Sequence, residues 1–327
     1  MKKKNHFCQY EDPEGYECLE EANNTGYCYW HDKSADKSGP DVKDWLNEHV
    51  RSGGMTRGIC LKNADLSQID LVNHHQKNGF DFSYADLYRA NLNGAHLFNI
   101  NFRNASLMKA DVRNAKLNCA HLENANLLGV KWQGCKIEHM KLGKKLLQEK
   151  QAKDAYKQGD SKKAYDFNEQ AEEIYRDLRK HAESEGIFTV SGELIQRELT
   201  MRRLQMPRLS LRRLGSKIVD LFCGYGEAPL RIVAISVLII FICATAYTFT
   251  GLNYQGDILK YSVDNTIKEN FSFFLSCLYY SIVTFTTLGY GDFTPVGVSR
   301  AIAAVEAFTG SFTIALFVVV FVKKMTR

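Results

Sequence analysis

Residues 287–292, with the sequence TLGYGD, place two glycines two positions apart between larger side chains. A dehydrated cation needs a cage of oxygen atoms to replace its water, and successive backbone carbonyls can supply rings of them. Several carbonyls in a row point at one axis only if the backbone takes unusual angles, which Gly289 and Gly291 allow because they lack a Cβ atom. The segment could therefore form a backbone that presents a row of oxygen atoms to a cation.

A second group of chemically active residues lies near the N-terminus, in residues 1–40. Cys8, Cys18, Cys28 and His31 follow a C-x9-C-x9-C-x2-H pattern. Three thiolates and one imidazole suit tetrahedral zinc, and the close pair of Cys28 and His31 has a usual half-site spacing. The outer spacings are wide, so two alternatives stay open: a reducing loop with free thiols, and disulfides.

Two apolar segments, residues 230–250 and 300–322, are each close to the roughly 20 residues that cross a bilayer. Basic residues precede the first and follow the second: Arg202, Arg203, Arg208, Arg212, Arg213, Lys217, Lys323, Lys324 and Arg327. The positive-inside rule puts both flanks, and so both termini, in the cytoplasm, which requires an even number of crossings. The uncharged segment 271–288 must then enter and leave the membrane on one side. Three plain anchoring helices are the alternative.

Residues 284–292, with the sequence TFTTLGYGD, closely resemble the pore signature of potassium channels, and residues 230–327 resemble a two-transmembrane potassium channel pore. This resemblance implies an all-α, multi-pass pore in the cell membrane, with residues 271–285 as pore helix and 286–292 as selectivity filter. It also implies that Thr287, Leu288, Gly289, Tyr290 and Gly291 hold potassium ions, with the Thr287 hydroxyl as an additional oxygen. Because four strands are needed to close each ring of oxygens, it implies a homotetramer around one axial pore. Leu288 stands where valine is commonest; its side chain points away from the ions, so selectivity should survive.

The resemblance also implies residues that support the filter. Tyr279 and Tyr280 occupy places where this family carries aromatic residues behind the filter, although both could instead be anchors against lipid. In the family an aromatic donor on the pore helix holds the aspartate just outside the filter, and Tyr279 precedes Asp292 at the matching offset. Thr286, which directly precedes the ion ligands, belongs to the same group. The pore helix should point its C-terminal partial negative charge at the central cavity.

Two residues of the second span are expected to act next to the pore helix. Glu306 is an ionisable group inside a membrane helix, which is costly unless it faces protein or water. We expect it near the lower pore helix, bonded to hydroxyls such as those of Ser281 or Thr284, rather than in contact with ions. Gly310 is a candidate gating hinge, and it is equally explained as a small residue that lets the pore helix approach.

Residues 55–142 contain a repeat of five residues, which runs without a break from residue 80 to about residue 142. Units such as Ala85-Asp86-Leu87 and Ala90-Asn91-Leu92 recur, and an earlier set is offset by one residue across 74–79. A period of five matches neither a helix nor a strand and predicts a solenoid with four faces, one pentad on each face. The pattern resembles the pentapeptide-repeat family, which implies a right-handed quadrilateral β-helix.

The charge of the repeats helps to select among the roles of that family. Some members mimic DNA through an acidic surface, but residues 59–142 contain more lysine and arginine than aspartate and glutamate. The net charge of the whole chain, +5, gives no strong case for nucleic acid. We therefore expect the repeat to be a structural platform or one that binds a protein partner or ligand.

Residues 143–229 should link the solenoid to the first span. Residues 144–183 read as a helical hairpin, with residues 144–157 and 162–183 as its helices, and a further helical stretch covers 192–205. The segment 222–229, which includes Gly224-Tyr225-Gly226, is expected to turn at the membrane surface.

The sequence as a whole predicts a multidomain membrane protein: a potassium-selective channel subunit with a cytoplasmic solenoid that regulates or positions it. The alternative is a membrane-anchored interaction scaffold whose pore is non-conducting or weakly selective. An enzyme is not indicated, because the sequence has no nucleotide loop, catalytic triad or paired-carboxylate motif. The solenoid is expected to act on the pore through the linker, although localisation through a partner is an alternative role.

Overall fold

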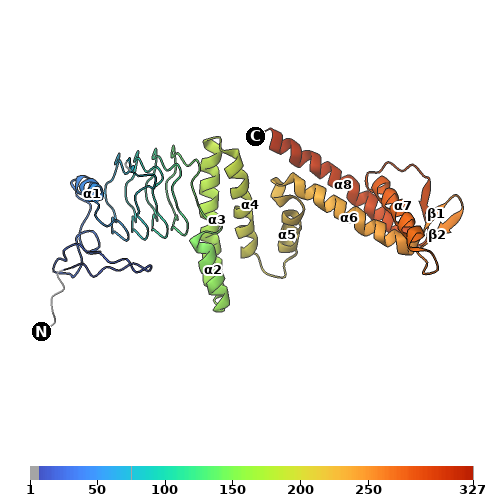
Figure 1. Cartoon of the computed structure of the whole chain (residues 1–327), viewed down its shortest axis with the longest axis horizontal. Coiled ribbons are helices and arrows are strands. Elements are labelled where there is room, and N and C mark those ends of the chain that lie inside the picture. Colours follow the sequence, from blue (N-terminus) through green and yellow to red (C-terminus); the bar gives the residue numbers. More distant parts are fainter. Residues whose placement is uncertain (1–6, 75, 327) are drawn as a thin grey trace. The chain divides into compact units, whose positions relative to one another are not determined.

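The structure is a computed structural model that describes residues 7–74 and 76–326. Its chain divides into an N-terminal unit, Met1–Arg208, and a C-terminal unit, Leu209–Arg327. The division falls in the short connection between helix α4 (Phe188–Gln205) and helix α5 (Leu211–Cys223). Figure 1 traces both units along the sequence.

Stacked coils form the centre of the N-terminal unit. Parallel bridges join residues 20 positions apart, such as Asp81 with Asn101 and Asp86 with Ser106, so each coil contains four pentads. The leucine-like positions point inward, as Leu87, Leu92 and Phe102 are at most 1% exposed. The alanine positions are buried as well, so each pentad has two inward sites. Each coil thus buries its apolar side chains against the next, as solenoid repeats require.

The first coil is longer than the others. Cys60 bridges to Asp86, 26 positions away, instead of to a residue 20 positions away. The register shift across 74–79 therefore adds six residues to one coil. Gly79 is required there, because a Cβ atom at this position would lie 2.0 Å from the carbonyl oxygen of Asn99.

Helices cover both ends of the stack (Figure 1). At the N-terminal end, α1 (Val42–Arg51) buries Val42, Leu46 and Val50 in the core that it shares with the coils. At the other end, Leu146 precedes α2 (Leu147–Lys157) and joins the same core. Apolar coil ends need such covers, because an uncovered end would expose the core to water.

The helices at the C-terminal end form a group of three, which includes the two helices of the predicted hairpin and the predicted helical stretch 192–205. α3 (Ser161–Ser184) packs on α2 and on α4. The Arg179 guanidinium contacts the Glu198 carboxylate at 2.7 Å, and Tyr175 is fully buried. The imidazole of His181 bonds the Cys135 carbonyl at 2.7 Å, which fixes α3 on the last coils.

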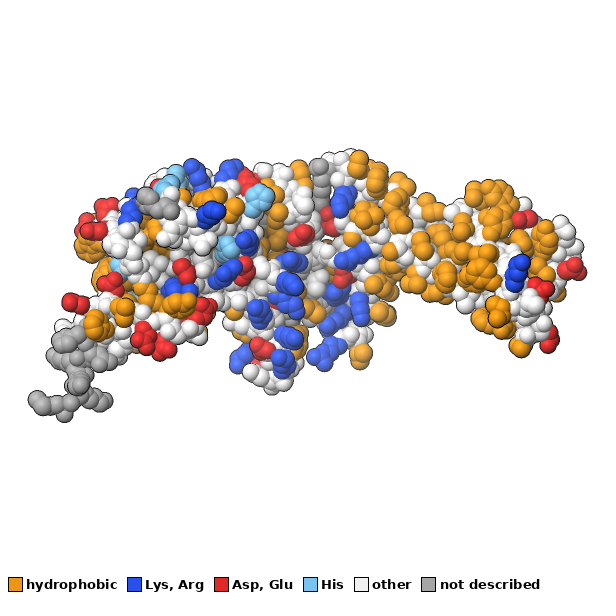
Figure 2. Space-filling model, in the orientation of Figure 1, with side chains coloured by type: hydrophobic (Ala, Val, Ile, Leu, Met, Phe, Trp, Pro, Cys, Tyr) orange, Lys and Arg blue, Asp and Glu red, His pale blue; other side chains and the backbone are white. Residues whose placement is uncertain are grey.

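The C-terminal unit contains two helices long and apolar enough, by length and composition, to cross a membrane: α6 (Pro229–Thr250) and α8 (Ser299–Met325). α7 (Ile267–Phe285) packs against both. Figure 2 shows apolar side chains over the visible face of these helices. This distribution suits contact with lipid better than contact with water.

Three short strands complete the C-terminal unit: β1 (Leu252–Tyr254), β2 (Asp257–Leu259) and β3 (Phe293–Pro295). They form an antiparallel sheet in the order β2-β1-β3. The basic segment before α6, for which no helix was predicted, forms α5, and the turn η1 (Gly224–Gly226) connects it to α6.

Candidate functional site

The predicted filter follows directly from the end of α7. The backbone N–H of Thr287 donates to the Thr284 carbonyl, and that of Leu288 donates to the Val283 carbonyl, both at 3.0 Å. From there φ is positive at every second residue: 59° at Thr287, 59° at Gly289 and 81° at Gly291. An alternation of left-handed and ordinary residues turns successive carbonyls toward one side of the chain, which a regular strand cannot do.

Two details of this segment were not predicted. Thr287 takes a left-handed conformation although it is β-branched, which is a rare and strained combination. Its hydroxyl donates to the carbonyl of Thr286 at 2.7 Å, while the hydroxyl of Thr286 donates to the Ile282 carbonyl at 2.7 Å. The hydroxyls of both threonines therefore bond backbone carbonyls at the end of α7, where the predicted filter begins.

The two tyrosines of α7 have different surroundings. Tyr279 is 40% exposed, and its hydroxyl interacts with the Asp292 carboxylate just beyond the filter. Tyr280 is buried, and its ring packs edge-on against Tyr247 of α6 with centroids 5.0 Å apart. The structure therefore brings Tyr279 and Asp292 together, whereas Tyr280 packs between helices.

Glu306 lies 1% exposed between α6, α7 and α8. Its carboxyl group contacts the Ser281 hydroxyl, as predicted, and accepts a hydrogen bond from the Tyr247 hydroxyl at 2.6 Å. Ser281 has one hydroxyl hydrogen, yet its oxygen is also 2.9 Å from the Ile240 carbonyl oxygen. All these groups are satisfied together if a protonated Glu306 donates to Ser281 and Ser281 donates to Ile240.

This arrangement makes a prediction about two substitutions. Glu306→Gln should be tolerated, because an amide can donate to Ser281 and accept from Tyr247 in the same geometry. Glu306→Leu should destabilise the protein, because it leaves buried hydroxyls without partners at about 1–3 kcal/mol each. Thermal unfolding in detergent measures the difference. Equal melting temperatures for the two variants would contradict a protonated Glu306 that donates to Ser281.

Gly310 lies where α8 crosses the end of α7. A Cβ atom there would be 2.0 Å from the Phe285 carbonyl oxygen. α8 runs through this position as one helix. The contact accounts for the small residue through close approach, and a hinge at Gly310 stays a prediction.

The N-terminal cysteines and histidine converge on one point. The ligand atoms of Cys8, Cys18, Cys28 and His31 all lie within 4.8 Å of one another, and all four residues are buried. The Nδ1 atom of His31 is 3.1 Å from the Cys28 sulfur and 3.6 Å from the Cys8 sulfur, and the sulfurs of Cys18 and Cys28 are 3.9 Å apart. Four donors at such spacing can surround one tetrahedral cation.

The surroundings of the cluster suit a metal. The Nε2 atom of His31 bonds the Arg57 carbonyl at 2.8 Å, which leaves Nδ1 directed at the sulfurs, as in many metal sites. Burial lowers the pKa of His31 and so favours the neutral imidazole that ligates metals. Burial raises the pKa of the Cys18 thiol to about 12, so a bound cation is needed to make its thiolate the stable form.

Arg57 joins this cluster to the solenoid. Its guanidinium contacts the carboxylates of Asp12 at 2.5 Å, Glu14 at 2.6 Å and Asp81 at 2.8 Å. The first two residues belong to the cysteine module and the third belongs to the coils. The ligand cluster and the end of the solenoid are therefore one structural piece.

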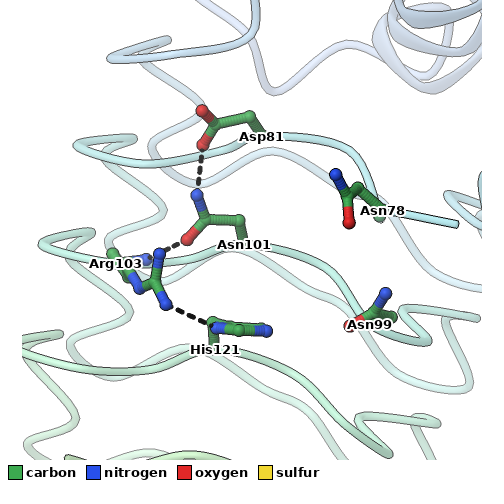
Figure 3. Close-up of a pocket in the computed structure, with 7 residues that line it drawn as sticks. Asn78, Asp81, Asn99, Asn101, Arg103 and His121 are labelled. Carbon is green, nitrogen blue, oxygen red and sulfur yellow. Dashed lines mark hydrogen bonds between the residues drawn. The ribbon is translucent and has the colours of Figure 1, made fainter.

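A polar groove of about 310 Å³ lies on the solenoid beside the long coil (Figure 3). It is lined by Asn78, Gly79, Asp81, Asn99, Asn101, Arg103 and His121. Asp81 accepts from the Asn101 amide at 2.7 Å, and the Arg103 guanidinium lies 2.9 Å from the His121 ring nitrogen. The polar groups thus pair with one another, and their mixed charges select no particular ligand class.

An elbow joins α5 to α6. Gly224, Tyr225 and Gly226 all have positive φ, at 54°, 57° and 85°, which is unusual for three residues in a row. Directly after them, the Glu227 carboxylate accepts from Lys323 Nζ at 2.9 Å, near the end of α8. The elbow therefore contacts the C-terminal end of α8. Val320 of the same end packs in an apolar cluster with Cys223 and Ile232.

Comparisons with known proteins agree with this division of the chain. Residues 235–327 match a family model described as an ion channel, and residues between 78 and 139 match the model for pentapeptide repeats. No curated protein matches the chain.

Several solved structures that resemble part of the chain are pentapeptide-repeat proteins. Rfr23 from the cyanobacterium Cyanothece 51142 is 27% identical over 28% of this chain and 60% of its own, with a TM-score of 0.18. HetL from Nostoc sp. strain PCC 7120, involved in heterocyst differentiation regulation, is 27% identical over 26% of this chain and 52% of its own, with a TM-score of 0.14. A pentapeptide repeat protein of the Arabidopsis thaliana thylakoid lumen is 25% identical over 37% of this chain and 83% of its own, with a TM-score of 0.14. The chain thus spans about half to three fifths of the length of the first two.

Proposed function

Because the chain joins an ion-channel domain to a run of pentapeptide repeats, we propose that it is a subunit of a potassium-selective channel whose repeat domain lies in the cytoplasm. The observation that carries this proposal is the alternating backbone of the filter, with positive φ at Thr287, Gly289 and Gly291. Rings of carbonyl oxygens require this alternation, and they replace the water of a potassium ion.

A homotetramer follows from the same proposal, because one chain supplies only one side of each oxygen ring. The filter side chains support assembly: Leu288 is 60% and Tyr290 67% exposed in the single chain. A hollow of about 350 Å³ lies behind the filter, between Val283 and Thr284 on one side and the filter glycines on the other. Neighbouring subunits would cover these apolar surfaces, which a monomer in lipid would leave partly unpacked.

Flux measurements test whether the pore conducts. Vesicles that contain the purified full chain should take up potassium along a gradient, and barium should block the uptake. A membrane-anchored interaction scaffold with a closed or vestigial pore gives no flux above that of empty vesicles, and this result would reject the channel proposal.

We further propose that the cysteine and histidine cluster holds zinc. A tetrahedral site with metal–sulfur bonds of about 2.3 Å separates its sulfurs by about 3.8 Å. The observed 3.9 Å between the sulfurs of Cys18 and Cys28 agrees with this value. A metal–nitrogen bond of about 2.0–2.1 Å would place Nδ1 about 3.6 Å from each sulfur, which matches the 3.6 Å to Cys8, whereas the 3.1 Å to Cys28 is shorter. Three thiolates and one imidazole are a usual ligand set of structural zinc, which would stabilise the first coil through Arg57.

The repeat domain is proposed to bias opening through α5 and the elbow. α5 carries Leu211, Leu214, Ile218 and Leu221 on one exposed face, and the basic residues Arg212, Arg213 and Lys217 between them. Such a helix suits the membrane surface, where each basic residue near anionic lipid contributes about 1 kcal/mol. Displacement of α5 would reach the end of α8 through the contact of Glu227 with Lys323.

Charge reversal at the elbow tests this route. Glu227→Lys or Lys323→Glu should change open probability several-fold, because a coupling of about 1–3 kcal/mol is sufficient for such a shift. The double variant restores an ion pair of opposite sense and should return open probability toward the wild-type value. Lys268→Glu, an exposed reversal on α7, is the matched control. Equal open probability in single and double variants would contradict coupling through this contact.

A further inference from the structure

The strand that follows the filter, β3, belongs to a sheet whose other two strands follow the C-terminal end of α6. β3 begins at Phe293, next to Asp292, and pairs with β1, which follows α6 directly. The register places Tyr254 opposite Phe293. β1 then turns through Gln255 and Gly256, whose φ values are 52° and 105°, into β2. Two residues with positive φ are the usual connection of a tight hairpin.

Two aromatic rings hold Phe293 between them. The ring of Tyr254 stacks on Phe293 with centroids 4.8 Å apart and planes 27° apart. The ring of Tyr279 meets the same side chain at 6.3 Å in an edge-on arrangement. Phe293 therefore lies between Tyr254 of β1 and Tyr279, the tyrosine that faces Asp292. Offset stacked and edge-on pairs of this kind are favourable beyond the area that they bury.

The residues at the start of β1 attach the sheet to the surrounding helices. Leu252 is fully buried in the cluster formed with Tyr247 and Cys277. The hydroxyl of Ser299, at the start of α8, lies 2.6 Å from the Gly251 carbonyl oxygen and 2.7 Å from the Thr250 hydroxyl. β1 is thus fixed to the ends of both α6 and α8, so it is a rigid support rather than a free loop.

We propose that Tyr254 is a positioning residue for the outer end of the filter. Its ring fixes Phe293, and Phe293 in turn fixes both Asp292 through the chain and Tyr279 through ring contact. Loss of the ring would let β3 shift, separate Asp292 from Tyr279, and shorten the time for which the filter conducts. The proposal rests on the proposed function of residues 287–291 as a selectivity filter.

Single-channel recordings of the full chain in bilayers test this role. Tyr254→Ala should shorten open bursts about three- to tenfold, the range expected for loss of an aromatic pair. Its preference for potassium over sodium should stay unchanged, and high external potassium should lengthen the bursts again, because ions in the filter oppose its collapse. Tyr254→Phe keeps the stacked ring and should retain wild-type bursts.

Two comparisons separate this role from a general effect on stability. Tyr261→Ala removes an aromatic residue of similar exposure that packs on Phe249 of α6 and not on β3. It should leave burst duration unchanged. Tyr279→Phe removes the hydroxyl that interacts with Asp292 and should also shorten the bursts. In the double variant Tyr254→Ala, Tyr279→Phe the two effects should be less than additive, because both act on Asp292.

Several outcomes would overturn the proposal: wild-type bursts in Tyr254→Ala, equal shortening in Tyr261→Ala, or shortened bursts in Tyr254→Phe. If Tyr254→Ala fails to assemble, Tyr254→Leu, which keeps apolar bulk without a ring, takes its place with the same expected shortening. Failure of the channel proposal itself is distinguishable, because the wild-type protein would then pass no selective current in the same bilayers.

Discussion

Replacement of Gly289 with alanine is expected to abolish potassium-selective conduction. Gly289 has a φ of 59°, in the left-handed region, where a side chain with a Cβ atom costs about 1–2 kcal/mol per residue. In a tetramer this cost arises four times around one ring of oxygens. Relaxation of the backbone relieves it but turns the carbonyl away from the axis, so the ring loses its ligands.

The matched control is Gly297→Ala. Gly297 has a φ of 51° and, like Gly289, has no atom within 4 Å of a Cβ at its position, but it lies after β3 and outside the filter. It therefore carries the same backbone strain without an ion ligand. Bilayer recordings compare the two variants. Potassium-selective current through Gly289→Ala, or equal loss of current in both variants, would show that residue 289 has no special role in the ion path.

Substitution of Cys28 with serine is expected to release the metal and destabilise the N-terminal unit. Loss of one ligand should weaken metal affinity at least about 100-fold, which corresponds to about 3 kcal/mol. A change of this size lowers the melting temperature of a unit of about 200 residues by roughly 6–12 °C. The buried thiols of Cys8 and Cys18 would also lose the cation that stabilises their thiolates.

Elemental analysis and thermal unfolding of the purified full chain measure both effects. The wild-type protein should contain about one zinc per chain, and His31→Ala should lose metal as Cys28→Ser does. Cys119→Ser, a change at a half-buried cysteine of the solenoid outside the cluster, should retain both metal and stability. Stoichiometric zinc in Cys28→Ser and His31→Ala would reject the site.

Features that depend on short spacing could be predicted from the sequence. The five-residue period matches neither a helix nor a strand, so it indicated stacked coils with one pentad on each face, and the parallel bridges between residues 20 positions apart agree with this. The positive φ of Gly289 and Gly291 followed from the need for aligned carbonyls. The contact of Glu306 with Ser281 followed from the cost of an unsatisfied carboxyl group between apolar helices.

Features that depend on long-range contacts could not. Tyr247 bonds Glu306 across 59 positions, and nothing in an apolar helix marks which hydroxyl faces inward. β1 and β3 are three residues long and about 40 positions apart, too short and too distant for a strand pattern to predict their pairing. The left-handed conformation of Thr287 opposes the intrinsic preference of a β-branched residue, so the residue type does not predict it.

The ion preference of the pore tests the central claim most directly. Purified full-length protein in planar bilayers, with potassium on one side and sodium on the other, gives a reversal potential that reports the permeability ratio. We predict a reversal potential close to the potassium equilibrium value, with rubidium able to replace potassium and with sodium and lithium largely excluded. A reversal potential near zero, which requires comparable permeability to sodium and potassium, would contradict the assignment of residues 287–291 as a potassium selectivity filter.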